Sequence, residues 1–163
     1  MQSNSEAVRE FTEAAGTKCP DKPKPMTRED VMFLVRMKLS EIDELVCTVT
    51  ENAEECEKFL QEALSSRDPC KNFKYETETE LIAAQFDALV DDHYYSLNVS
   101  ARHGVNLDRV FGVVHDANMA KRDPTTGKFL RRESDGKILK PAGWKAPDIE
   151  AEIERQKAEG AWN

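Results

Sequence analysis

Apolar residues recur every three or four positions along most of the chain, which is the spacing of one helix face. The clearest stripe opens at Thr27, where Asp30 completes a capping pattern, and it continues to Val49. Capping residues also precede the other helical patterns, at Ser3, Asn52, Thr77, Asn106 and Asp148. These starts predict helices over residues 3–16, 27–49, 52–67, 77–103, 106–119 and 149–159. We therefore expect an all-α fold, a helical bundle of four to five main helices.

The helical pattern stops between residues 120 and 147. This segment contains eight basic and three acidic residues, although the whole chain carries a net charge of −8. Asp135 and Gly136 form the preferred turn pair of a tight β-hairpin. We predict a basic, hairpin-like flap, because long irregular segments in compact domains usually have a function or are disordered. Such a flap could bring cations to phosphate groups, but on charge alone a solvated basic loop is the simpler interpretation.

Length and composition limit the classes of function. The 163 residues suit one domain, spanning residues 1–163. No apolar run reaches the ~18 residues of a membrane helix, and the polar N-terminus is unlike a secretory signal. No two of the four cysteines are three positions apart, so the usual zinc or redox spacing is missing and we expect free thiols in a reducing cytoplasm. Because the chain is acidic, we expect no binding to nucleic acid. Because it has no apolar run of membrane length, we expect no membrane partner either.

Four carboxylates occur where an apolar core is expected. Glu41 and Glu44 are three positions apart on the second predicted helix, and Glu41 borders its apolar stripe. Asp87 and Asp91 are one turn apart on the fourth, which is apolar around much of its circumference and should lie in the middle of the bundle. Unpaired buried carboxylates cost several kcal/mol each. A divalent cation between them would remove this cost, and the oxygen ligands favour Mg²⁺, with Mn²⁺ also possible.

Two alternatives to this metal site remain open. The four acids could face solvent, or they could pair with Arg36, Lys38 or Arg102. A softer metal such as zinc or iron could instead bind His93 and His115, although a single histidine on a helix is more often a packed or surface residue.

Four segments resemble one family, the all-α nucleoside triphosphate pyrophosphohydrolases, in their MazG-like and phosphoribosyl-ATP pyrophosphohydrolase-like group. Residues 36–45 resemble its first motif, Glu-Glu-x-x-Glu-Leu, and residues 87–91 its second acidic motif. Residues 114–121 resemble the Val-His-x-x-Asn-Met-x-Lys signature of the phosphoribosyl-ATP pyrophosphohydrolase-like branch, and residues 136–148 its closing segment. The resemblance spans roughly residues 8–150, and four motifs in this order are fairly specific.

The resemblance implies a reaction and a set of site residues. The expected reaction is metal-dependent hydrolysis of a nucleoside triphosphate between the α and β phosphates, giving a monophosphate and pyrophosphate in nucleotide house-cleaning. Glu41 and Glu44 would be catalytic and would bind Mg²⁺ together with Asp87 and Asp91. Substrate would be bound by cations that neutralise phosphates, by an amide and by aromatic rings. These residues are Phe11, Arg36, Lys38, Asn118, Lys121, Lys140 and Trp144.

The chain departs from the family motifs at two positions. Ser40 stands where the family has a glutamate that is a candidate for activating the attacking water, and Ala84 stands where the second motif often has a glutamate. A metal-activated water or a neighbouring carboxylate would then have to supply the base.

Three rival functions remain open, and the departures motivate the first of them. The chain could be a catalytically silent nucleotide- or protein-binding module, a purely structural bundle, or a hydrolase of phosphoribosyl-ATP. No separate motif indicates the last substrate. Family resemblance and a half-exposed apolar face both favour a homodimer or homotetramer.

Overall fold

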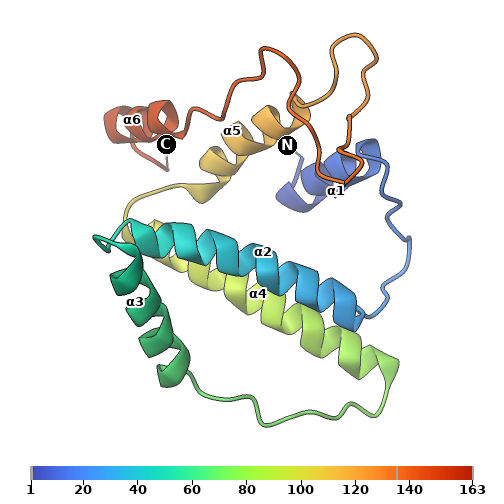
Figure 1. Cartoon of the computed structure of the whole chain (residues 1–163), viewed down its shortest axis with the longest axis vertical. Coiled ribbons are helices and arrows are strands. Elements are labelled where there is room, and N and C mark those ends of the chain that lie inside the picture. The colour runs from blue at the N-terminus through green and yellow to red at the C-terminus, as the bar shows by residue number, and fades with distance from the viewer. Residues whose placement is uncertain (1, 135, 163) are drawn as a thin grey trace. The chain divides into compact units, whose positions relative to one another are not determined.

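The computed structural model describes residues 2–134 and 136–162, and the regular elements in these residues are six helices (Figure 1). They are α1 (Asn4–Ala14), α2 (Arg28–Cys47), α3 (Ala53–Ser66), α4 (Glu78–Arg102), α5 (Leu107–Met119) and α6 (Ile149–Glu159). The all-α prediction is therefore confirmed. None of these helices combines the length and apolar character that a membrane span requires.

The helix starts follow the capping residues of the sequence. The Ser3 hydroxyl accepts the Glu6 backbone N–H, and the Glu6 carboxylate accepts the Ser3 N–H in return, which makes a complete capping box. Thr27 and Asp30 do the same for α2. Because each of these contacts spans only three residues, short-range sequence patterns were enough to place the starts.

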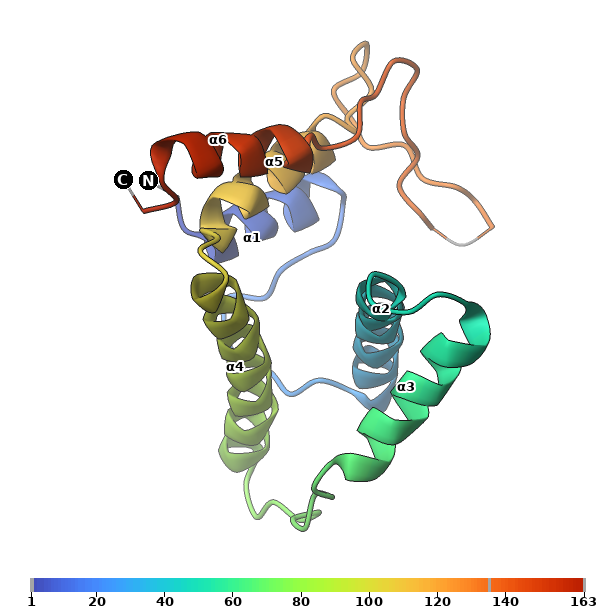
Figure 2. The same cartoon turned by 90° about the vertical axis from the view of Figure 1, so that its left-hand side faces the viewer.

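The chain divides into two compact units, residues 23–89 and residues 1–22 with 90–163. One boundary between the units falls between Leu89 and Val90. Both residues belong to the long helix α4 (Figure 2). The prediction of a single domain stays a prediction.

In the unit of residues 23–89, α2 packs closely on α3. Val46 and Cys56 are the buried residues of the two helices. The first half of α4 is connected to the chain before α2 by the side-chain amide of Gln85, which donates to the Met26 carbonyl at 3.0 Å and accepts the Met26 N–H at 2.8 Å. Among the described residues of this unit, the buried ones therefore lie on the helix pair α2 and α3.

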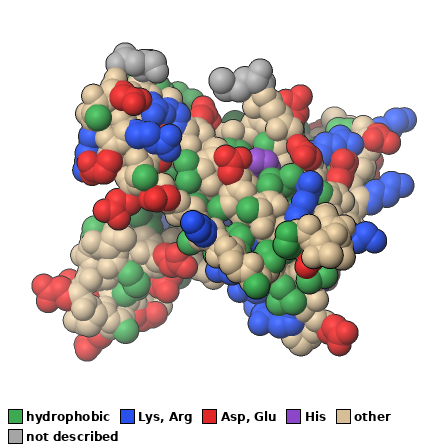
Figure 3. All heavy atoms as spheres, turned by 90° about the horizontal axis from the view of Figure 1, so that it is seen from above, with side chains coloured by type: hydrophobic (Ala, Val, Ile, Leu, Met, Phe, Trp, Pro, Cys, Tyr) green, Lys and Arg blue, Asp and Glu red, His purple; other side chains and the backbone are tan. Residues whose placement is uncertain are grey.

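The prediction that α4 lies in the middle of a bundle is wrong for the single chain. No described residue of α4 is buried, and Val90, Tyr94 and Tyr95 are each more than 60% exposed. The reason is that, within each unit, no described helix packs closely on the part of α4 that belongs to that unit. Figure 3 shows one face of the molecule, on which apolar side chains lie at the surface among charged ones. Large exposed apolar areas of this kind usually mark an interaction surface.

In the other unit, α5 packs on α1 and on α6. Its interior is partly polar, because Glu152 and Gln156 of α6 are buried. The Glu152 carboxylate accepts from Gln156 at 3.0 Å and pairs with Arg109 at 2.8 Å and with Arg155 at 2.7 Å. The hydrogen bond from Gln156, followed by the two guanidinium charges, holds the pKa of Glu152 below its ordinary value.

Replacing Arg109 by methionine should destabilise this unit. The Glu152 carboxylate would lose the partner that joins α5 to α6 and would stay buried without it. We expect the midpoint of thermal unfolding, measured by circular dichroism, to fall by several degrees. The matched control is Arg155→Met, because Arg155 pairs with the same carboxylate from an exposed position on α6 itself. Equal shifts in both variants would contradict the assignment.

The segment after α5 forms the predicted basic flap, residues 120–147. Two isolated antiparallel bridges, Arg122 with Phe129 and Arg131 with Ile138, make it hairpin-like. Gly136 has a φ of +72°, a conformation that favours glycine in a turn. Asp135, the other half of the predicted turn pair, lies outside the described residues. The Arg131 guanidinium fixes the flap to the end of α1, because it donates twice to the Ala15 carbonyl at 3.1 and 2.7 Å.

Candidate functional site

The predicted metal ligands are four exposed carboxylates on α2 and α4. Glu41 and Glu44 are three positions apart on α2, and Asp87 and Asp91 are one turn apart on α4, so the members of each pair lie on nearly the same side of their helix. Among the described residues, none of the four accepts a hydrogen bond or pairs with a cation, and pairing with Arg36, Lys38 or Arg102 does not occur. These oxygens are therefore available to a ligand.

Burial of these carboxylates was expected from the sequence, and this expectation is wrong for the single chain. The apolar stripe of α2 that Glu41 borders is itself exposed, with Ile42 42% and Leu45 68% accessible. In the described part of residues 23–89, the oxygens of Glu41, Glu44 and Asp87 do not gather within a few ångströms of one another. In the isolated chain these carboxylates are therefore hydrated.

Ser40 occupies the position beside Glu41 but is not equipped to act as a base. Its hydroxyl donates a hydrogen bond to the Arg36 carbonyl, one turn earlier on α2, at 3.2 Å. The Arg36 side chain is exposed and Lys38 is half-buried, both on α2. Their predicted contacts with phosphate stay predictions.

Four predicted substrate-binding residues come together at the end of α5 and in the flap. We call Asn118, Lys121, Lys140 and Trp144 the lysine cluster. The Lys121 ammonium donates to the Asn118 side-chain oxygen at 2.6 Å. The Trp144 ring lies 5.5 Å from the Lys121 Nζ and 4.3 Å from the Lys140 Nζ, measured to the ring centroid. The indole N–H fixes this end of the flap on α5 by donating to the Ala117 carbonyl at 2.7 Å.

The lysine cluster is electrostatically suited to an anion. Partial burial lowers the pKa of Lys121, and repulsion from Lys140 and Lys137 lowers it further. A phosphate near these ammonium groups would relieve the repulsion. Sequence reasoning named Lys121 and Lys140 but missed Lys137, for which the only signal was its place in the basic segment.

Anion binding at the cluster should weaken as the pH rises, starting below the ordinary titration range of lysine. The sign follows from the lowered pKa, because Lys121 loses its charge at a lower pH than an unperturbed lysine. We expect this trend in calorimetric titrations with inorganic pyrophosphate at increasing pH. Lys121→Arg keeps its charge and should move the decline to higher pH, whereas Lys128→Arg on the exposed part of the flap should not. An unchanged profile in Lys121→Arg would contradict the assignment.

Phe11, a predicted substrate-binding residue, and His115, an alternative metal ligand, each pack against another aromatic ring. Phe11 of α1 contacts Phe129 of the flap edge to face, with ring centroids 5.1 Å apart. His115 of α5 stacks on Phe111 at 5.9 Å. Neither contact tests whether a nucleotide base stacks on Phe11. Among the described residues, neither His115 nor His93 belongs to a group of potential metal ligands.

Comparison with known proteins assigns the chain to a family. The family model of phosphoribosyl-ATP pyrophosphohydrolase matches residues 8–118, more than half of the chain. The chain belongs to the phosphoribosyl-ATP pyrophosphohydrolase family. The matched residues include all four carboxylates and Asn118, whereas Lys121, Lys140 and Trp144 follow the matched segment.

A solved structure extends the likeness over the rest of the chain. It is the crystal structure of a protein from Exiguobacterium sp. 255-15, regarded as a candidate NTP pyrophosphohydrolase. The two chains are 28% identical, the match covers 97% of this chain and 98% of the other, and the TM-score is 0.83. No curated protein matches the chain. The family and this relative support a pyrophosphohydrolase enzyme with an all-α fold.

Proposed function

We propose that this protein hydrolyses a nucleoside triphosphate between the α and β phosphates, releasing a nucleoside monophosphate and pyrophosphate. The observation that carries the proposal is the presence of four unpaired carboxylates at the motif positions of α2 and α4 in a chain of this family. The lysine cluster supports it, because its cations and its aromatic ring suit the phosphates and the base of a nucleotide.

A divalent cation fits the chemistry of the donor set. Glu41, Glu44, Asp87 and Asp91 offer only carboxylate oxygens, which Mg²⁺ and Mn²⁺ prefer, and no described cation competes for them. We propose that these four residues hold Mg²⁺. When bound, the ion would polarise phosphate oxygens and acidify a water molecule.

The remaining steps belong to the side chains of this protein. Lys121 and Lys140 would neutralise the charge of the triphosphate, and Asn118 would keep the Lys121 ammonium in place through its 2.6 Å hydrogen bond. Because the Ser40 hydroxyl is not basic and donates to its own helix, the proton of the attacking water would pass to Glu41 or Glu44.

A panel of canonical and modified nucleoside triphosphates with Mg²⁺ tests the proposal. The readout is pyrophosphate, with the monophosphate identified by chromatography. We expect pyrophosphate from at least one nucleotide. Release of inorganic phosphate instead would place the cleavage at another bond.

Phosphoribosyl-ATP is a second candidate substrate, favoured by the family model that matches residues 8–118. It contains the same α–β phosphoanhydride, so the same residues would serve. Including it in the panel separates the two candidates. Nucleotide binding by calorimetry without turnover of any compound would favour a silent binding module, as the departures at Ser40 and Ala84 allow.

We propose further that the protein is a homo-oligomer, either a dimer or a tetramer. On α2, Val35 is 46% and Leu45 is 68% exposed, and Val49, just after the helix, is 69% exposed. A second copy could cover this apolar stripe. Light scattering should then give at least twice the mass of one chain. Leu45→Glu should shift the protein toward the monomer, whereas Leu64→Glu, an exposed position on α3, should not. A monomeric wild-type protein at micromolar concentration would contradict this proposal.

A further inference from the structure

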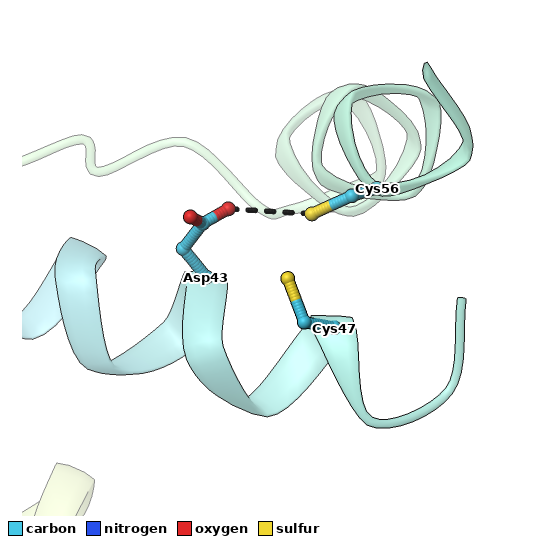
Figure 4. Close-up of side chains that lie close together, drawn as sticks. All are labelled: Asp43, Cys47 and Cys56. Carbon is cyan, nitrogen blue, oxygen red and sulfur yellow. Dashed lines mark hydrogen bonds between the residues drawn. The ribbon is translucent and has the colours of Figure 1, made fainter. Parts of the chain in front are cut away.

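Two cysteines and an aspartate meet where α2 joins α3 (Figure 4). Asp43 and Cys47 are one turn apart on α2, and Cys56 projects from the first half of α3. One ligand atom from each of the three lies within 4.8 Å of the other two. The Cys56 thiol donates to Asp43 Oδ1 at 3.2 Å. Among the described residues, this is the group of side chains best placed to hold a metal ion.

The corner between the two helices is fixed by local hydrogen bonds. The Thr48 hydroxyl donates to the Leu45 carbonyl at 2.7 Å, and the Thr50 hydroxyl donates to the Val46 carbonyl at 3.0 Å. Asn52 then caps α3. Cys56 is 6% exposed, whereas Cys47 and Asp43 are open to solvent. The three ligands are therefore held near one another and remain accessible from one side.

We propose that Asp43, Cys47 and Cys56 form a binding site for a thiophilic divalent cation of the Zn²⁺ class. Zinc binds thiolate sulfur at about 2.3 Å and carboxylate oxygen at about 2.0–2.2 Å, so tetrahedral neighbours lie roughly 3.5–3.8 Å apart. Because the three ligand atoms lie within 4.8 Å of one another and Cys56 Sγ is already 3.2 Å from Asp43 Oδ1, shifts on the order of 1 Å would bring them to these spacings. Three protein ligands leave the fourth position open to water or another small ligand.

The donor atoms separate this site from the proposed Mg²⁺ site. Thiolates select soft and borderline metals, and they bind Mg²⁺ poorly. On α2, the side of Asp43 and Cys47 is rotated by roughly 110° from that of Glu41 and Glu44, at 3.6 residues per turn. The inference therefore does not rest on the proposed enzymatic function.

A metal explains the cluster better than a disulfide does. A bond between Cys47 and Cys56 would leave the Asp43 carboxylate without the thiol to which it is hydrogen-bonded. In the reduced protein this hydrogen bond, together with burial and the neighbouring thiol, raises the pKa of Cys56 to about 12. A metal ion takes the place of the thiol proton and uses all three side chains, and its binding would hold the ends of α2 and α3 together.

Cobalt titration of the full-length, reduced, metal-free protein tests the proposal. Co²⁺ bound to thiolate gives a charge-transfer band in the near ultraviolet, which the carboxylates of α2 and α4 cannot produce. We expect this band to saturate at one equivalent per chain and to disappear on addition of one equivalent of Zn²⁺ but not of excess Mg²⁺. Zn²⁺ affinity is then measured by competition with a chromophoric chelator.

The variants assign the ligands. Cys47→Ser changes an exposed residue and should weaken Zn²⁺ binding at least 100-fold without unfolding the helices, and Asp43→Asn should weaken it about 10-fold. Cys70→Ser changes another exposed cysteine and should leave the affinity unchanged. Absence of the charge-transfer band, equal affinity in wild-type protein and Cys47→Ser, or a Cys47–Cys56 disulfide that persists under mild reduction with no metal bound would each overturn the proposal.

Discussion

Replacing Glu44 by glutamine should lower Mg²⁺-dependent pyrophosphate release by a factor on the order of 100 or more. The change keeps the size of the side chain but removes one charge from the proposed metal ligands, and glutamine cannot accept a proton from water. The measurement is kcat with saturating nucleotide over a range of Mg²⁺ concentrations. Because Glu44 is exposed and unpaired among the described residues, the variant should fold like the wild-type protein.

The matched control is Glu54→Gln, which changes an exposed glutamate in the first turn of α3. It alters the net charge by the same amount and should leave turnover unchanged. If Glu44→Gln retains wild-type turnover at all Mg²⁺ concentrations, Glu44 neither binds the metal nor takes the proton. A defect that excess Mg²⁺ rescues would instead assign Glu44 to metal binding alone.

Removing the ammonium of Lys121 should reduce kcat/KM for the nucleotide by about 10- to 100-fold. Lys121 is held at the cluster by Asn118 and the Trp144 ring, so its charge is positioned before the substrate arrives. Lys121→Ala tests this in steady-state kinetics. Lys140→Ala should have a smaller effect, because Lys140 is exposed and its charge is better screened by solvent.

Two comparisons separate a specific role from the general loss of positive charge. Lys121→Arg keeps the charge and should retain most of the activity, although its planar group fits the Asn118 oxygen differently. Lys128→Ala removes an exposed charge from the same flap and should have little effect. Equal losses in Lys121→Ala and Lys128→Ala would mean that only the overall potential of the flap matters.

The sequence was sufficient for features that depend on nearby residues. The capping boxes of Ser3 with Glu6 and Thr27 with Asp30 are complete within three positions, so the helix starts could be predicted. The irregular segment before Asp148 was also predicted, because a loss of helical period is visible directly. The contact between Asn118 and Lys121 is likewise local, because the two residues are three positions apart at the end of α5. The approach of Trp144 to Lys121 depends instead on the path of the flap.

Features that depend on packing between distant segments could not be predicted. The apolar character of α4 indicated a central helix, but the pattern cannot tell whether the covering surface belongs to the same chain or to another molecule. The burial expected for Asp87 failed for this reason.

The cysteine cluster was missed because its spacing is not a standard motif. Asp43 and Cys47 are one helical turn apart on α2. The chain changes direction at residues 48–52, so that Cys56 of α3 lies close to both of them. A search for cysteines three positions apart does not detect ligands that a turn between two helices brings together.

A crystal structure with Mn²⁺ and a nucleotide analogue that resists cleavage between the α and β phosphates would show whether the carboxylates of α2 and α4 bind a divalent cation. Anomalous scattering locates the manganese independently of the protein. We expect a peak within bonding distance of carboxylate oxygens from Glu41, Glu44, Asp87 and Asp91, with the phosphates beside it. Manganese bound elsewhere, with these four carboxylates still facing bulk water in the presence of the nucleotide, would contradict it.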